Sequence, residues 1–122
     1  MRKAFVPTLI VSILAGCATA PDPQAERGPD GTFAYNVPVD SSEPGARIEV
    51  NGEFLGTTPM TLKIFGDKDG TFHNFGSYDF IVRAHPPGTG RPSQTKVYKT
   101  GALMAAEDKI PERIYFDFGP KP

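Results

Sequence analysis

The fold of this chain is decided by the stretch EPGARIEVNGEFLGTTP, residues 43–59. Ala46, Ile48 and Val50 alternate with charged residues, and a period of two predicts a strand with one buried face and one solvated face. Asn51 and Gly52 follow directly, and this pair favours a type I′ turn because both of its residues accept a positive φ. The stretch therefore predicts a tight hairpin whose short return strand ends at Gly56.

The segments on either side of the hairpin predict further short strands. Residues 60–64 and 32–39 carry the same alternation. Because Pro38 lacks a backbone N–H, the strand at 32–39 is expected to lie at a sheet edge or to end there. More strands are expected over residues 77–85, 94–100 and 113–118, and one or two helical turns over residues 101–108. With 13 glycines and 13 prolines in 122 residues, the pattern predicts an all-β domain.

The ordered set of motifs around the hairpin resembles the PEGA domain, a small β module of bacterial and archaeal surface proteins. The family is named for a Pro-Glu-Gly-Ala motif, which stands here as Glu43-Pro44-Gly45-Ala46, and Thr58-Pro59 follows at the expected place. The resemblance spans residues 37–64 and continues loosely to Arg83. It implies a small antiparallel β-sandwich-like fold, a surface location, no catalytic residues and no agreed ligand. Residues 66–76 form a longer loop than the family pattern has, so a specific function could reside there.

The first 16 residues predict a secretory signal peptide. Arg2 and Lys3 precede an apolar run of 12 residues, 4–15, which is shorter than the roughly 20 residues that a membrane-spanning helix needs. The run leads into Leu14-Ala15-Gly16-Cys17, which resembles the bacterial lipobox. That resemblance implies cleavage between Gly16 and Cys17 and a lipoprotein that carries fatty acids such as palmitate on Cys17. An ordinary signal peptide followed by a chance cysteine is the alternative.

The predicted anchor also suggests where the protein resides. Two or three acyl chains hold a protein on a membrane far more firmly than one chain does. In Gram-negative lipoproteins an Asp after the cysteine commonly causes retention in the inner membrane, and this chain has Ala18 instead. We therefore expect a cell-envelope protein that is anchored in the outer membrane and faces the periplasm.

Residues 17–31 are expected to be the lipidated cysteine and a flexible tether, followed by the β domain over residues 32–122. Positions 18–31 contain three prolines and two glycines but no Val, Ile, Leu or aromatic residue. Such a segment cannot bury enough apolar surface to offset the entropy of ordering it. The tether would hold the domain clear of the lipid headgroups.

Charge and cysteine content exclude several classes of function. After residue 16 the chain has 11 basic and 14 acidic side chains, a formal charge of −3. This mild acidity argues against binding to nucleic acid, which favours a basic surface. Because Cys17 is the one cysteine, its acylation would leave no thiol for a disulfide, a metal site or redox chemistry.

The loop and the strand after it contain a cluster of aromatic and polar residues. The cluster comprises Phe72, His73, Asn74, Phe75 and Tyr78. Exposed rings of this kind can stack on sugars or anchor a protein partner. The alternative is that Phe72 and Phe75 plug one end of the β core.

Other candidate sites are weaker. Residues 67–70, DKDG, begin like a calcium loop but lack the later ligands of an EF-hand. His73 and His85 lack acidic or cysteine partners at ligand spacing in the sequence, which predicts surface histidines. Four basic residues could gather as an anion site or form a solvated charged face: Arg83, Arg91, Lys96 and Lys99. No nucleophile elbow or phosphate loop is found, so we expect neither a cofactor nor an enzyme.

The sequence thus predicts a lipid-anchored, non-catalytic cell-envelope protein that acts as a structural or protein-interaction module. Its expected partners are the membrane, through Cys17, and another envelope protein. A module that binds a glycan such as peptidoglycan is the alternative, and its contact residues would be Phe72, His73, Phe75 and Tyr78.

Overall fold

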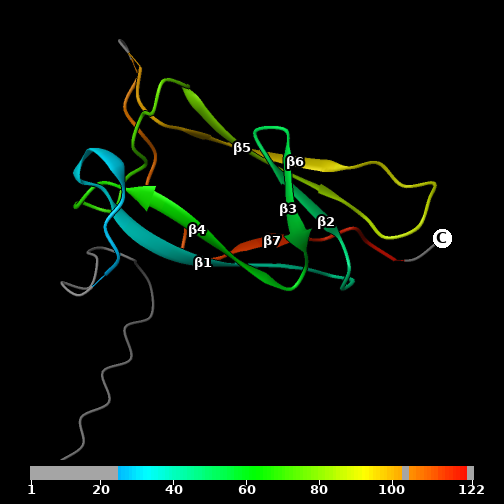
Figure 1. Ribbon diagram of the computed structural model, residues 1–122. Coiled ribbons are helices and arrows are strands. Elements are labelled where there is room, and N and C mark those ends of the chain that lie inside the picture. Colours follow the sequence, from blue (N-terminus) through cyan, green and yellow to red (C-terminus); the bar gives the residue numbers. More distant parts are fainter. Residues whose placement is uncertain (1–24, 103–104, 121–122) are drawn as a thin grey trace, which may run out of the picture.

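The computed structural model describes residues 25–102 and 105–120 (Figure 1). The predicted signal peptide, its cleavage site, Cys17 and tether residues 18–24 lie outside the described residues. The strands are β1 (Phe33–Ser41), β2 (Arg47–Val50), β3 (Glu53–Thr57), β4 (Met60–Gly66), β5 (Asp79–His85), β6 (Gln94–Lys99) and β7 (Ile114–Phe116), and a 3-10 turn, η1 (Pro29–Gly31), precedes them. Within this part of the chain, no helix is long and apolar enough to cross a membrane.

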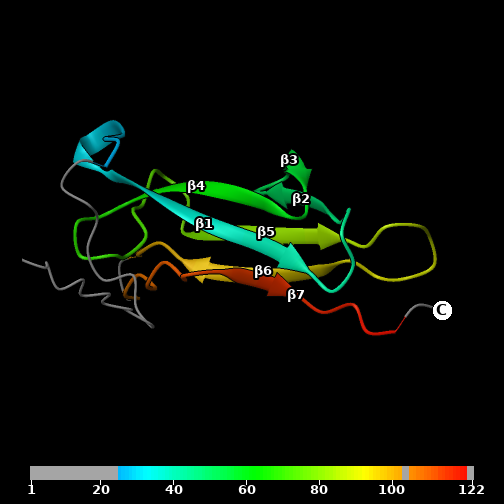
Figure 2. The same cartoon turned by 90° about the horizontal axis from the view of Figure 1, so that it is seen from below.

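The strands form two sheets that stack as the layers of a sandwich. One sheet has the order β4-β1-β7 and the other the order β3-β2-β5-β6. Figure 2 looks onto the three-stranded sheet, with β5 and β6 behind it. Neighbouring strands are antiparallel, except that β7 runs parallel to β1 with Ile114 opposite Val39. The prediction of an all-β sandwich is confirmed, and the parallel pair makes the smaller sheet mixed.

The core lies between the sheets and follows the alternation of the sequence. Val39 of β1, Ile48 of β2 and Val82 of β5 are completely buried, and burial of such a side chain contributes about 1.5–3 kcal/mol. The other members of this cluster are Tyr35, Val37, Leu62, Ile64, Phe72, Ala84, Ile110, Ile114 and Phe116. Both sheets contribute residues to this cluster, so the inner face of each sheet is buried by the other sheet.

The hairpin between β2 and β3 turns at Asn51 and Gly52, as predicted. Their φ angles are 48° and 87°, the left-handed values that a type I′ turn requires. The Asn51 side chain also accepts a hydrogen bond of 2.7 Å from the backbone N–H of Ile81 on β5. The turn is therefore fixed by its own backbone and by the neighbouring strand.

Thr58 holds the turn at residues 43–46 in place. The N–H of Gly45 donates to the Thr58 carbonyl at 2.8 Å, and the N–H of Ala46 donates to Thr58 Oγ1 at 3.0 Å. Thr58 Oγ1 also lies 2.6 Å from Ser41 Oγ at the end of β1. Glu43-Pro44-Gly45-Ala46, the segment that resembles the motif for which the PEGA family is named, is thus a structural turn in this chain.

Two expectations about secondary structure are wrong. Pro38 predicted that its strand would lie at a sheet edge or end there, but β1 is the middle strand of its sheet. Strand β7 pairs with β1 only from Val39 onward. Pro38, which has no backbone N–H, therefore lies outside that pairing. The described part of the segment expected to be helical, residues 101–102 and 105–108, contains no helix. Instead the Asp108 N–H donates to the Lys99 carbonyl at 2.8 Å, and the Asp108 carboxylate accepts a bond of 2.7 Å from the Lys99 N–H.

The last residues of the predicted tether are ordered against the domain. The N–H of Ala34 donates to the Glu26 carbonyl at 2.8 Å, and Arg27 lies over the Phe33 ring at 3.9 Å. The Glu26 carboxylate accepts a bond of 2.6 Å from Lys63 of β4. Backbone hydrogen bonds and one surface ion pair hold this segment. The sequence prediction considered only burial of apolar side chains, so it did not detect these polar contacts.

Candidate functional site

The loop after β4 is fixed to the domain at both ends. Residues 67–70 form a turn in which the Gly70 N–H donates to the Asp67 carbonyl at 3.0 Å. The Phe72 N–H then donates to the Asp108 carbonyl, and the Ile110 N–H donates to the Gly70 carbonyl. The loop therefore packs on the segment between β6 and β7, which positions the side chains that follow.

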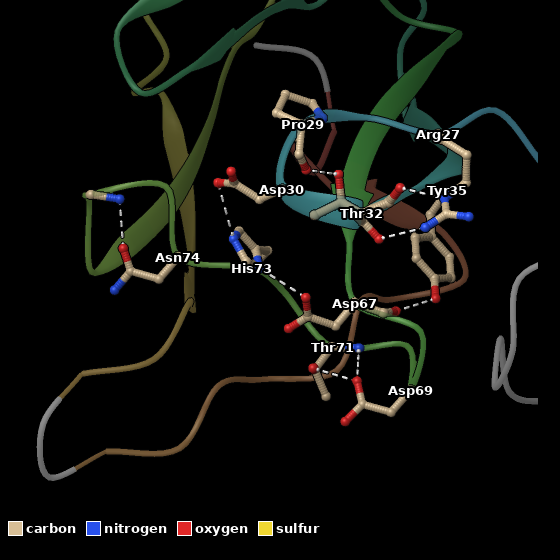
Figure 3. A network of polar contacts seen from close by, with 12 residues as sticks. Arg27, Pro29, Asp30, Thr32, Tyr35, Asp67, Asp69, Thr71, His73 and Asn74 are labelled. Carbon is tan, nitrogen blue, oxygen red and sulfur yellow. Dashed lines mark hydrogen bonds and ion pairs between the residues drawn. The ribbon is translucent and has the colours of Figure 1, made fainter.

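The turn at 67–70 holds a carboxylate in a structural role. Asp69 Oδ1 accepts hydrogen bonds from the Thr71 N–H at 3.1 Å and from the Thr71 hydroxyl at 2.6 Å (Figure 3). These two bonds stabilise the ionised form and lower the pKa of Asp69. Within the described residues, no group of three or more His, Cys, Asp or Glu side chains could hold a metal ion.

Phe72 is a core residue. Its side chain is 1% exposed, and its ring centroid lies 5.1 Å from that of Phe80 and 5.2 Å from that of Tyr98. Burial raises the pKa of the Tyr98 hydroxyl beside it. Phe72 therefore fills one end of the β core. The prediction that it contacts a ligand is wrong, because its ring does not reach the surface.

His73 connects the loop to the segment before β1. Its Nδ1 lies 2.8 Å from Asp67 Oδ1 and its Nε2 lies 3.6 Å from Asp30 Oδ2 (Figure 3). The sequence predicted surface histidines without acidic partners at ligand spacing; the structure adds two acidic neighbours to His73, Asp67 from its own loop and Asp30 from the segment before β1. His85 has a similar neighbour, with its Nε2 3.1 Å from Glu49 Oε2.

Phe75 and Tyr78 are the exposed members of the predicted cluster. Their side chains are 52% and 65% exposed, and the Phe75 ring lies 4.6 Å from the His73 ring. Tyr78 borders an open depression of about 540 Å³ that Asp67, His73 and Asn74 also line. The Asn74 amide bonds to the Gly101 carbonyl and the Gly76 N–H, so it positions this surface.

The four predicted anion-binding residues do not converge. Arg83 donates to Thr95, and Lys99 forms an ion pair with Asp79. Lys96 lies over the Phe116 ring, and Arg91 pairs with Glu43. Each cation has its own partner, which agrees with a charged face rather than an anion site.

The sequence analysis missed the outer face of the four-stranded sheet. Phe54 on β3 and Val97 on β6 are 57% and 49% exposed. Between them, Glu49 of β2 stands directly opposite Arg83 of β5 in the register of the sheet. A groove of about 450 Å³ lies beside this pair, lined by Glu49, Asn51, Gly52, Ser77, Ile81 and Arg83. The alternation of β2 and β5 places these residues outward, but only the strand order brings them together.

Comparison with known proteins gives one match. The PEGA domain family matches residues 34–68, which run from β1 through β4 to the first residues of the loop. No curated protein and no solved structure matches the chain. The match includes the hairpin and the turn at 43–46, whereas the exposed Phe75 and Tyr78 lie beyond it.

Proposed function

We propose that this protein is a lipid-anchored, non-catalytic cell-envelope protein whose β domain acts as a structural or protein-interaction module. The observation that carries the proposal is the position of Cys17, directly after an apolar run that ends in Leu14-Ala15-Gly16. The chain thereby combines a lipobox-like sequence with a region that matches the PEGA domain. The exposed apolar residues of the outer face support a role in contact with other molecules.

Acylation of Cys17 is tested in cells that are fed an alkyne-tagged fatty acid. We expect the wild-type protein to take up the label, and the intact mass should fit a chain that begins at an acylated Cys17. Cys17→Ser should lose the label completely, whereas Thr19→Ser, a neighbouring change that keeps the thiol, should keep it. A labelled Cys17→Ser variant, or an unlabelled wild-type protein, would refute the anchor.

The membrane that holds the protein is tested by density-gradient fractionation. We propose that the outer membrane does so, because Ala18 is not the Asp that favours retention in the inner membrane. Ala18→Asp should therefore move the protein to the inner-membrane fraction while labelling at Cys17 persists. If wild type and Ala18→Asp fractionate alike, residue 18 does not decide the location.

The interaction role is tested by crosslinking whole cells and purifying the protein from the membrane fraction. We expect an envelope protein as the main crosslinked species. The Cys17→Ser variant should be absent from the membrane fraction and should no longer be crosslinked to that protein. Recovery of wall polymer without a protein partner would instead favour the second candidate.

That second candidate is a module that binds a cell-wall glycan. It is favoured by the exposed Phe75 and Tyr78 rings and by the depression beside Tyr78, where the Asp67 and His73 side chains supply polar groups. The test is co-sedimentation of the purified protein with peptidoglycan. Tyr78→Ala should reduce binding at least about tenfold, the effect of losing one anchoring contact of roughly 1.4 kcal/mol. Tyr115→Ala, which removes an exposed ring of β7, is the matched control and should have no effect.

A further inference from the structure

We infer that a second copy of this chain binds the outer face of the β3-β2-β5-β6 sheet and forms a two-fold symmetric dimer. The inference starts from the two apolar side chains on this face. Phe54 and Val97 are each about half exposed or more, at 57% and 49%, and they lie on β3 and β6, at opposite edges of the sheet. Each side chain leaves apolar surface in contact with water, and the two stand on either side of a charged centre.

The centre of the face carries one charge of each sign. Glu49 on β2 and Arg83 on β5 occupy directly opposite positions of an antiparallel pair. Phe54 is the register partner of Glu49 on its other side, and Thr95 is the register partner of Arg83. The face therefore presents a row in the order Phe54, Glu49, Arg83, Thr95, with Val97 two residues beyond Thr95.

This row is complementary to itself. A two-fold axis that runs parallel to the strands, between β2 and β5, places β2 of one copy over β5 of the other. Glu49 of each copy then faces Arg83 of the other copy, and Phe54 faces the Thr95 and Val97 strand. An isologous contact needs this property, because the same surface is used twice. Two opposite-charge contacts and two apolar contacts would form at once.

The charge arrangement favours a second copy over an unrelated partner. A uniformly acidic or basic face would repel a second copy of itself. On this face, the two-fold arrangement brings Glu49 of each copy opposite Arg83 of the other copy. Within one chain, the Arg83 Nε donates to Thr95 at 3.1 Å, and Glu49 lies beside His85. These contacts orient the two charged side chains on the face. Sheets that pack face to face lie about 10 Å apart, which allows their outward side chains to interdigitate.

The test uses reversed charges in the full-length protein, purified in detergent and sized by light scattering over a range of concentrations. Wild type should dimerise, and its dissociation constant should rise with salt because ion pairs at an accessible interface are screened. Glu49→Arg and Arg83→Glu should each weaken dimerisation at least about tenfold, because each variant places like charges against each other. An equimolar mixture of the two variants should restore the dimer, since each arginine again faces a glutamate.

Recovery in the mixture cannot arise from a change within one chain, so it separates contact between copies from loss of folding. Phe54→Ser, a change at an exposed position, should also weaken the dimer. Lys68→Glu and Glu112→Arg reverse charge at exposed positions away from this face and should leave the dimer unchanged. A wild-type protein that stays monomeric, single variants that dimerise as wild type does, or a mixture without recovery would each overturn the inference. The outcome does not depend on whether Cys17 is acylated.

Discussion

Arg91, in the connection between β5 and β6, forms a two-pronged ion pair with Glu43 at the turn before β2. The side chains of both residues are only 13% exposed, and Arg91 also donates to the Pro87 carbonyl. The pair joins a long surface connection to the turn at residues 43–46, which lies within the region that matches the PEGA domain. It explains why Arg91 does not take part in an anion site.

Loss of this pair should destabilise the domain. Arg91→Ala removes the two-pronged ion pair from a Glu43 carboxylate that is only 13% exposed, and breaking a poorly solvated pair by removing one member is costly. We expect the melting temperature of Arg91→Ala to fall by several degrees and that of Arg91→Lys to fall less, since lysine keeps the charge but not the two-pronged geometry. Differential scanning fluorimetry would measure both. Equal melting temperatures for wild type and Arg91→Ala would show that the pair does not stabilise the fold.

Phe72 and Phe75, three residues apart, should respond differently to truncation. Phe72→Ala should lower the free energy of unfolding by about 3–5 kcal/mol, because it opens a cavity between Phe80 and Tyr98. Phe75→Ala, at an exposed position, should change it by less than about 0.5 kcal/mol. Urea titrations followed by circular dichroism would measure both. Similar losses for the two variants would contradict the burial described here.

Asp69 should contribute to the pH dependence of stability. Its pKa is lowered in the folded state, chiefly by the Thr71 hydroxyl and then by the Thr71 N–H. A group with a lowered pKa stabilises the fold above its unfolded pKa, which is about 3.9 for Asp, and this contribution is lost as pH falls through the folded value. Asp69→Asn should therefore flatten the loss of stability below about pH 4.

The measurement is a series of urea midpoints from pH 7 to pH 2. Glu112→Gln, which neutralises an exposed carboxylate on the segment before β7, serves as the matched control. An Asp69→Asn profile that overlays the wild-type profile would show that Asp69 does not contribute to the acid sensitivity of the fold.

Gly66, at the end of β4, is expected to tolerate no side chain. A Cβ atom there would lie 2.3 Å from Ile110 Cδ1 and 2.7 Å from the Thr71 carbonyl oxygen, and the second neighbour is backbone that cannot rotate away. Gly66→Ala should therefore cost about 1–3 kcal/mol through overpacking. The free energy of unfolding from urea titration checks this value, and a neutral result would mean that the loop can move away from β4.

The sequence predicted the elements of the fold better than their arrangement. Alternation identified the buried side of β2 and β4, and Asn51-Gly52 identified the hairpin, because these signals are local. The central position of β1 depends on β7, whose partner residues lie more than 70 positions earlier in the chain, and no local pattern encodes that pairing. The helical turns expected at 101–108 were wrong because pairing with Lys99 overrode local propensity.

The candidate site was predicted in part for the same reason. The aromatic cluster was found from composition, but spacing alone could not separate the buried Phe72 from the exposed Phe75. The acidic neighbours of His73 come from the loop itself and from Asp30, which the sequence analysis had placed in a flexible tether. The outer face was missed because Glu49 and Arg83 meet only once the strand order is known.

The parallel pairing of β1 with β7 also bears on when the domain can fold. Ile114 and Phe116, both buried, are among the last residues of the domain to be synthesised, and they complete a sheet that begins with the first strand. A chain that is still being synthesised would have β1 without this neighbour, and one side of its core would be uncovered. Contacts between such distant residues slow folding. The domain therefore reaches its native state only after nearly all of its sequence is available, so the chain would have to stay soluble and unaggregated until then.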